Sequence, residues 1–214
     1  MLTVWCVCVG DGYKHDYVHI LRNMVRRNLS IEHRFVCISD QHIDGIDTIG
    51  PPTNLQGWWQ KLSLFKAGVA GETNMYLDLD VVVTGCLDSL VTRYSAKPLA
   101  TPWNWARSGH GGCQSSVMLW GGKDAYTIYD EFPHEIAHWP PINKPPILWG
   151  DQEFITTRRH NGFPVTQIDA DLVKSYKYHA KPMGRVPDNC RVVVFHGKPD
   201  PHECSEQWIK DAWC

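Results

Sequence analysis

Two carboxylates interrupt an otherwise apolar segment, Asn74-Met-Tyr-Leu-Asp-Leu-Asp-Val-Val-Val83. Its β-branched and aromatic residues predict one buried strand over 74–83. Side chains alternate along a strand, so we expect Asp78 and Asp80 on the same side of the sheet. Two such carboxylates repel each other and are costly to bury, and a divalent cation would relieve both problems. The pattern alone leaves open two aspartates that cap neighbouring turns or pair with arginine.

Strand-like and helix-like segments alternate around this one. The sequence predicts strands at 2–9, 33–39, 99–101, 116–120, 165–168 and 191–195, and helices at 16–28, 58–70, 124–131 and 150–159. The prolines of 139–149 predict a loop, and the tail from Gly197 is polar and turn-rich. This alternation favours an α/β fold with a mostly parallel central sheet flanked by helices. No repeat or linker divides the 214 residues, so we expect a single domain over 1–214.

The charge balance and hydropathy exclude several classes of protein. Lysine and arginine number 21 against 23 acidic residues, a net charge of −2. This balance excludes a polybasic nucleic-acid binder that works by phosphate neutralisation alone, although not a local basic cleft. No stretch approaches the roughly 18 apolar residues of a membrane span. The chain opens on a strand-like run, so we expect no secretory signal and a cytoplasmic location.

The eight cysteines include no CxxC pair, so the sequence lacks the motif that is typical of zinc-ribbon and thioredoxin-like sites. We expect free, buried thiols in a reducing cytoplasm. The alternative is a zinc site at Cys190, His202 and Cys204, although its ligand spacing matches no familiar pattern.

Ten tryptophans are unusually many for a chain of this length. Large rings fill small cores, and their faces also stack on sugars and bases. We expect most of them in the core and two or three at a ligand. The candidates that occur near turns or in polar company are Trp58, Trp59, Trp103, Trp105, Trp139 and Trp149.

Three further polar clusters could bind a ligand. His196-Gly197-Lys198 follows a predicted strand and offers a metal-competent nitrogen, close backbone approach and a cation for phosphate. It could equally be a surface turn. Asp151, at a predicted helix start, could be only an N-cap. Lys61 could be a solvated helix residue or a cation in a cleft.

Taken in order, these segments resemble a GT-A-fold glycosyltransferase, in particular glycosyltransferase family 8 and compact bacterial and phage relatives. The resemblance spans nearly the whole chain, and its strongest part is the family's DxD strand at Tyr76–Asp80. The other segments that carry it are Trp59-Gln-Lys-Leu-Ser-Leu-Phe65, Cys113-Gln-Ser-Ser-Val-Met118, Gly150-Asp-Gln-Glu153 and His196-Gly-Lys-Pro199. Two positions depart from the family pattern: Glu153 stands where an aspartate is usual, and Gln114 replaces an asparagine.

The resemblance implies a Rossmann-like GT-A fold and a hexosyl- or pentosyltransferase. Such an enzyme moves a sugar from a nucleoside-diphosphate sugar, expected to be a UDP-sugar, to a hydroxyl with retention. It implies Mn²⁺ or Mg²⁺ held by Asp78, Asp80 and His196. The implied donor-binding residues are Gly10, Asp11, Tyr13, Asp78, Gln114, Ser115, Gly197 and Lys198. The implied catalytic residues are Lys61, Asp151 and Gln152.

Two other functions stay open. One is a non-catalytic nucleotide-sugar or glycan-binding module, and the other is a metal-dependent nucleotidyltransferase or phosphohydrolase. For a transferase, the acceptor could be a glycan, a protein hydroxyl or a small molecule. It could also be a hydroxymethylated DNA base, which would have to be extruded from the duplex.

Overall fold

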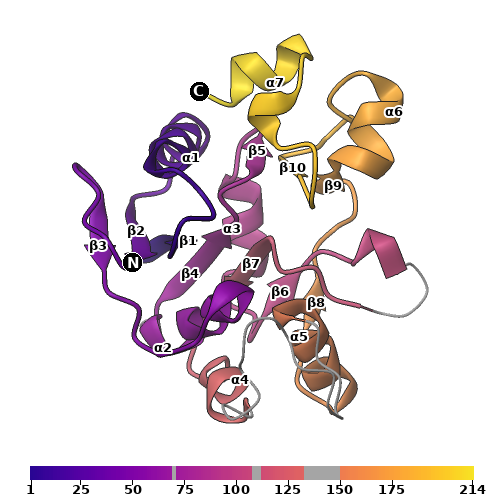
Figure 1. Ribbon diagram of the computed structural model, residues 1–214. Coiled ribbons are helices and arrows are strands. Elements are labelled where there is room, and N and C mark those ends of the chain that lie inside the picture. Colours follow the sequence, from indigo (N-terminus) through magenta and orange to yellow (C-terminus); the bar gives the residue numbers. More distant parts are fainter. Residues whose placement is uncertain (69–70, 108–111, 133–149) are drawn as a thin grey trace.

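The structure is a computed structural model that describes residues 1–68, 71–107, 112–132 and 150–214 (Figure 1). Seven strands form the main sheet in the order β3-β2-β1-β4-β7-β6-β8. Four of its six strand pairs are parallel, and β7 runs antiparallel to both of its neighbours. The mostly parallel sheet predicted from the sequence is therefore confirmed. The strands are β1 (Leu2–Cys8), β2 (His33–Ser39), β3 (Asp47–Ile49), β4 (Thr73–Leu77), β6 (Ala100–Thr101), β7 (Val117–Trp120) and β8 (Thr166–Gln167).

Helices cover both faces of this sheet because its central strands are apolar on both sides. Val4 and Cys6 of β1 belong to the core cluster beneath α1, whereas Trp5 belongs to the cluster formed with η1 and α2. Figure 1 shows α1 and α2 on opposite sides of β1 and β4. The α-helices are α1 (His15–Asn28), α2 (Leu64–Ala67), α3 (Asp88–Tyr94), α4 (Tyr126–Asp130), α5 (Asp151–His160), α6 (Lys181–Met183) and α7 (Gln207–Ala212). The 3₁₀ helices are η1 (Gly57–Ser63), η2 (Trp105–Arg107) and η5 (Pro201–Glu203), and η4 (Tyr176–Ala180) is a π-helix.

A second sheet begins where the first one is interrupted. It contains β5 (Val81–Val83), β10 (Val192–Val194) and β9 (Val173–Ser175), in the order β5-β10-β9. The prediction of one continuous strand over 74–83 is therefore wrong. β4 ends at Leu77, and the backbone N–H of Val81 donates to the carbonyl of Asp78 at 3.4 Å across a turn. The two carboxylates sit in this turn, so strand alternation is not what orients them.

Several short elements escaped the sequence prediction. β3, α3, β9, η4 and α7 are three to seven residues long, too short for a clear periodic pattern. The predicted helix 58–70 is largely the 3₁₀ helix η1, followed by one α-helical turn. The tail ends in α7, which buries Ile209. The predicted loop 139–149 lies outside the described residues.

All eight cysteines are free thiols, as predicted, and six are buried. Cys86 and Cys214 are exposed, which corrects the expectation of a fully buried set. In the described ranges, none of the helices is both long and apolar enough to cross a membrane.

The parallel pairing of β1 with β4 brings their carboxyl ends to the same edge of the main sheet. Ligands of open α/β sheets bind beyond this edge. The loop after β1 carries Tyr13, and the turn after β4 carries Asp78 and Asp80. The topology therefore gathers residues that are more than 60 positions apart in the sequence.

A buried hydrogen bond joins β1 to β4. The indole nitrogen of Trp5 donates to Oδ1 of Asn74 at 2.9 Å, and both residues are buried. We expect Asn74→Leu to lower the free energy of unfolding by about 1–3 kcal/mol, because it leaves a buried donor without a partner. Urea denaturation measures this loss.

The double variant Trp5→Phe/Asn74→Leu removes donor and acceptor together. We expect it to lose less stability than the sum of the two single variants, since neither group is then left unpaired. A single Asn74→Leu variant as stable as the wild type would show that this bond does not hold the two strands together.

Candidate functional site

Two cavities open beyond the carboxyl ends of β1 and β4. The first has a volume of about 350 Å³ and is mainly apolar, with Val7, Val9 and Leu79 in its wall. The second, here called the polar cavity, has a volume of about 380 Å³, and most of the residues that line it are polar or charged. Both are lined by Tyr13, Trp58, Lys61 and Asp78, which therefore lie where the two cavities meet. The polar cavity is also lined by Asp80, Gln114, Ser115, Ser116, Gly150, Asp151, Gln152, Glu153, Phe195, His196 and Gly197.

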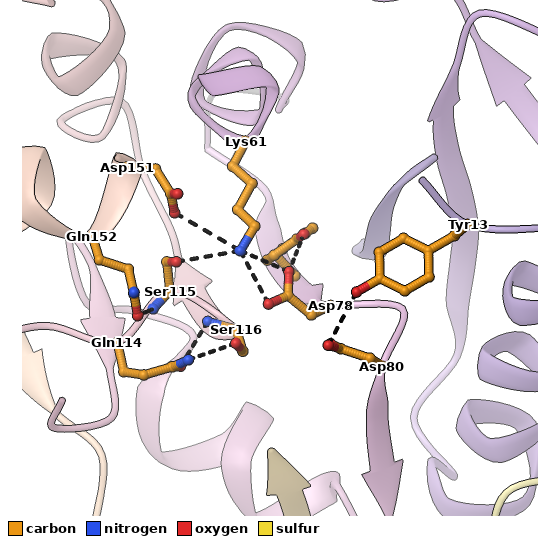
Figure 2. Close-up of polar contacts among 10 residues, drawn as sticks. Tyr13, Lys61, Asp78, Asp80, Gln114, Ser115, Ser116, Asp151 and Gln152 are labelled. Carbon is orange, nitrogen blue, oxygen red and sulfur yellow. Dashed lines mark hydrogen bonds and ion pairs between the residues drawn. The ribbon is translucent and has the colours of Figure 1, made fainter. Parts of the chain in front are cut away.

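Lys61 joins the two sides of the polar cavity (Figure 2). Its ammonium lies 2.8 Å from Oδ1 of Asp78 and 3.8 Å from Oδ2 of Asp151, and it donates to the hydroxyl of Ser115 at 3.3 Å. Burial alone would lower the pKa of Lys61, but the carboxylates of Asp151 and Asp78 outweigh burial and raise it. Lys61 is therefore a charged cation in a cleft and not a solvated helix residue.

The two aspartates of the turn have different partners. Asp78 accepts hydrogen bonds from the hydroxyl of Tyr76 at 2.5 Å and from Lys61 at 3.0 Å. Asp80 accepts a hydrogen bond from the hydroxyl of Tyr13 at 3.1 Å. Burial and the neighbouring Asp78 charge raise the pKa of Asp80 to about 7. Too little positive charge therefore lies near Asp80 to offset burial and the repulsion from Asp78.

Asp151 is the first residue of α5 and not its N-cap, which is Gly150. The Asp151 side chain is buried, and burial raises the pKa of its carboxyl while Lys61 opposes the shift. Within the described residues, Oδ2 of Asp151 accepts no hydrogen bond. This oxygen is instead the one that faces the Lys61 ammonium at 3.8 Å.

Glycine at position 150 lets Trp58 approach the start of α5. A Cβ atom there would lie 2.9 Å from the indole nitrogen of Trp58, too close for any other residue without displacement of the ring. The sequence indicates Trp58 only as one of six tryptophans that could stack on a ligand, not as part of this site. Gly150 was named only as the first residue of the segment Gly150–Glu153. Its position directly before Asp151 was the one signal that could have placed it in the site.

Amide side chains line the opposite wall of the polar cavity. Gln152 accepts a hydrogen bond from the backbone N–H of Ser115 at 3.4 Å. Gln114 donates to the hydroxyl of Ser116 at 2.6 Å and accepts from the N–H of Ser116 at 2.7 Å. The predicted residues Gln114, Ser115 and Gln152 thus lie together. Two residues that were not predicted hold predicted ones in place: Ser116 hydrogen-bonds to Gln114, and Tyr76 donates to Asp78.

Three predicted donor-binding residues do not line the polar cavity: Lys198, Gly10 and Asp11. The ammonium of Lys198 pairs with Asp200 at 2.7 Å and Glu203 at 3.2 Å, and Lys198 lines neither cavity. The N–H of Gly10 donates to the carboxylate of Asp40. Asp11 lines a separate cavity of about 420 Å³, which shares Gly12 with the apolar cavity and Tyr13 with both cavities. Gly197, which precedes Lys198 in the same motif, does line the polar cavity.

The tryptophans divide between core and surface. Trp58 and Trp103 are exposed, whereas Trp59 is buried against Phe132. The Trp103 ring faces the guanidinium of Arg159 at 5.1 Å, and Trp105 lies beside His196. Trp139 and Trp149 lie outside the described residues.

The predicted ligands Asp78, Asp80 and His196 all line the polar cavity. Burial and Lys177 lower the pKa of His196, which favours the neutral ring that can ligate a metal. Carboxylate oxygens with one imidazole suit Mn²⁺ or Mg²⁺. A bound cation would also supply the positive charge that the Asp80 carboxylate lacks.

These side chains are nevertheless not gathered as a ready-made site. Among the residues that the structure describes, no three His, Cys, Asp or Glu side chains are grouped so that they could hold an ion. This finding also removes the zinc alternative. Cys190 and Cys204 donate to backbone carbonyls, and His202 bonds to Tyr17.

Comparisons with known proteins identify the fold. No protein-family model and no curated protein matches the sequence. Among solved structures, the galactosyltransferase LgtC, in complex with donor and acceptor sugar analogues, shares 15% identity at a TM-score of 0.69, over 98% of this chain and 93% of that one. GlyE of Streptococcus pneumoniae TIGR4 shares 14% identity at a TM-score of 0.68, over 100% of this chain and 60% of that one.

The bifunctional glycosyltransferase WbbM shares 9% identity at a TM-score of 0.64, over 94% of this chain and 46% of that one. At these identities the likeness concerns the fold. The chain has the GT-A fold of glycosyltransferases, as the resemblance in its motifs predicted.

Removal of the Lys61 charge should leave the repulsion between the Asp78 and Asp151 carboxylates without compensation. The pKa of Asp151 is raised in the folded protein, so ionisation of Asp151 costs stability as the pH rises, and Lys61 opposes this cost. We expect Lys61→Met to lower the free energy of unfolding by about 3–5 kcal/mol at mildly alkaline pH. The loss should shrink at mildly acidic pH, where the carboxyls become protonated.

Urea denaturation across the pH range measures this effect. The matched control is Lys66→Met, because Lys66 is exposed and faces the Tyr129 ring at 5.1 Å. The control should cost no more than about 1 kcal/mol at any pH. A Lys61→Met loss that does not depend on pH would contradict the proposed charge balance.

Proposed function

We propose that this chain is a metal-dependent glycosyltransferase. It moves a sugar from a nucleoside-diphosphate sugar, with UDP as the expected nucleotide, to a hydroxyl acceptor. The observation that carries the proposal is the Lys61 ammonium between Asp78 and Asp151, in a cavity that also contains Asp80, within a GT-A fold. Retention of the anomeric configuration rests on the family resemblance. NMR of the first-formed product would show which anomer is made.

The two adjoining cavities support this substrate class. The apolar cavity suits a flat base and a ribose, because the Tyr13 and Trp58 rings lie in its wall. The polar cavity suits a diphosphate and a sugar, which need hydrogen-bonding partners. Asp78 lines both cavities, so a nucleoside diphosphate that spans them would pass over this carboxylate.

Asp78, Asp80 and His196 are the residues that would hold Mn²⁺ or Mg²⁺. A bound dication supplies positive charge to the diphosphate as it leaves. Such ions usually take one or two protein carboxylates and complete their shell with substrate phosphate and water.

Asp151 is the residue that we place nearest to the reacting carbon. Cleavage of a sugar–phosphate bond develops oxocarbenium character on the sugar. Asp151 lines the polar cavity, and its negative charge would stabilise that cation or orient an acceptor hydroxyl. Lys61 holds Asp151 and Asp78 in one arrangement, and Gln152 is fixed by the backbone of Ser115.

Asp80 supplies the direct test of metal-dependent transfer. We expect Asp80→Asn to reduce the release of nucleoside diphosphate from a UDP-sugar by about 10²–10³-fold, because the leaving group loses electrostatic stabilisation. Turnover is measured with Mn²⁺ and with a chelator. The matched control Asp171→Asn changes an exposed carboxylate and should leave turnover unchanged.

The products separate the proposal from the other functions. Nucleoside diphosphate is expected from sugar transfer or from transfer to water. Pyrophosphate or phosphate would instead indicate a nucleotidyltransferase or a phosphohydrolase. Donor binding without any turnover would indicate a binding module. Turnover that is indifferent to both Asp80→Asn and the chelator would contradict the metal-dependent mechanism.

Binding of the nucleotide should stabilise the folded chain by mass action. At 100 times its dissociation constant, a ligand adds about 2.7 kcal/mol, or roughly 5–10 °C for a chain of this size. With Mn²⁺ present, we expect UDP to raise the melting temperature by this amount, and CDP, ADP and GDP to raise it less. A thermal-shift screen in which no nucleoside diphosphate raises the melting temperature would contradict the donor class.

A further inference from the structure

The third cavity, of about 420 Å³, is separate from the place proposed for sugar transfer. It shares Tyr13 with the other two cavities, but Lys61, Asp78 and Asp151 are not among the described residues that line it. Its volume lies within the range of cavities that bind small molecules. Its wall comes from the loop after β1, the first turns of α1, the region of η5 and the residue that follows α7. A molecule bound there would therefore be distinct from the nucleotide-sugar.

Four rings lie close together in this wall. The centroid of the Tyr17 ring lies 5.0 Å from that of Tyr13 and 5.0 Å from that of Trp213. The His202 ring lies 5.9 Å from the Tyr17 ring and 6.2 Å from the Trp213 ring. Rings of this kind give the non-polar C–H groups of a ligand a surface on which to pack.

Hydrogen bonds hold three of these rings in place before any ligand binds. The Tyr17 hydroxyl lies 2.5 Å from Nδ1 of His202, which ties η5 to α1. Arg27 of α1 donates to the carbonyls of the residues before and after Trp213, at 2.6 Å and 2.7 Å. Figure 1 shows the end of the chain beside α1 accordingly. The cavity is therefore preformed, and preformed sites lose less entropy on binding.

Hydrogen-bonding side chains of both kinds line the same cavity. Asp11, Asp16 and Asp200 bring carboxylate acceptors, and Lys14 brings an ammonium donor. The pair with Lys198 offsets the charge of Asp200, but the charges of Asp11 and Asp16 would still repel an anion. A cation could not accept a hydrogen bond from the ammonium, whereas a hydroxyl group both donates and accepts. The wall therefore suits a neutral molecule that has several hydroxyl groups and a non-polar face.

We propose that the third cavity binds a neutral sugar residue, separately from the nucleotide-sugar donor. The C–H face of the sugar packs on the rings, and its hydroxyl groups bond to the carboxylates and to Lys14. This binding goes beyond the proposed function and does not depend on it. Its use in catalysis does rest on the proposed function, because a glycan anchored there stays beside the transfer site at a raised effective concentration.

Titration of the ¹⁵N-labelled full chain with maltose, cellobiose or lactose tests the proposal. Each tryptophan gives one indole N–H resonance, and that of Trp213 is identified by its loss in Trp213→Phe. We expect at least one of the three disaccharides to shift the Trp213 resonance in a saturable way. Saturating UDP with Mg²⁺ should leave this titration unchanged, because Trp213 is not among the described residues that line the other two cavities.

Calorimetry with two variants places the sugar in the cavity. We expect Trp213→Ala to weaken binding by about tenfold, since it removes a ring on which the sugar packs. The exposed Asp16 offers a variant with little risk to the fold, and Asp16→Asn should weaken binding by about 3- to 10-fold through loss of a charged acceptor.

The matched control is Trp208→Ala. Trp208 lies in α7 and, like Trp213, is half-buried, but it is not among the described residues that line the three cavities. The control should bind the sugar as the wild type does. Equal weakening in Trp208→Ala and Trp213→Ala, with Asp16→Asn unaffected, would show a general effect of α7 and overturn the proposal.

The outcomes separate this inference from the proposed function. A Trp213 resonance that none of the disaccharides moves would overturn the inference, and so would one that moves with choline alone, which would indicate a site for organic cations. If UDP shifts the same resonance and displaces the sugar, the third cavity belongs to the donor site and the inference falls. A chain that binds a disaccharide there but releases no nucleoside diphosphate would contradict the proposed function and leave this inference standing.

Discussion

The pairing of one buried ammonium with two carboxylates underlies the candidate site. Lys61 comes from a 3₁₀ helix, Asp78 from the turn after β4 and Asp151 from the start of α5. Burial of any one of these charges alone would be unfavourable, because an isolated ion loses its hydration. Together they offset one another, and the need to do so fixes three segments of the chain around one cavity.

The sequence allowed much of this arrangement to be predicted, because its signals were local. Continuous apolar runs such as 2–9 and 33–39 indicated the central strands, and the spacing of apolar residues indicated α1. The motifs around Lys61, Asp78 and Asp151 indicated residues of one site, and the structure places all three in the same polar cavity. Their catalytic roles stay predictions.

The rest depended on contacts that no local pattern encodes. The break between Leu77 and Val81 follows from the second sheet, whose partner β10 lies over 100 residues further along the chain. The hydrogen bond between the Ser175 hydroxyl and His196 gave no signal either, because a serine in a short strand is unremarkable until its register against Val194 is known. Lys198 had a suitable motif, but the nearby carboxylates of Asp200 and Glu203 take its ammonium away from the cavities.

Trp58 belongs to the walls of both cavities, and its indole occupies the space that a Cβ atom at position 150 would need. Any change that moves this ring reshapes the two compartments at once. If the compartments select the base and the sugar, those two preferences cannot be tuned separately through this position. Divergence toward a new donor, in nature or by engineering, would then have to start from the walls that the compartments do not share.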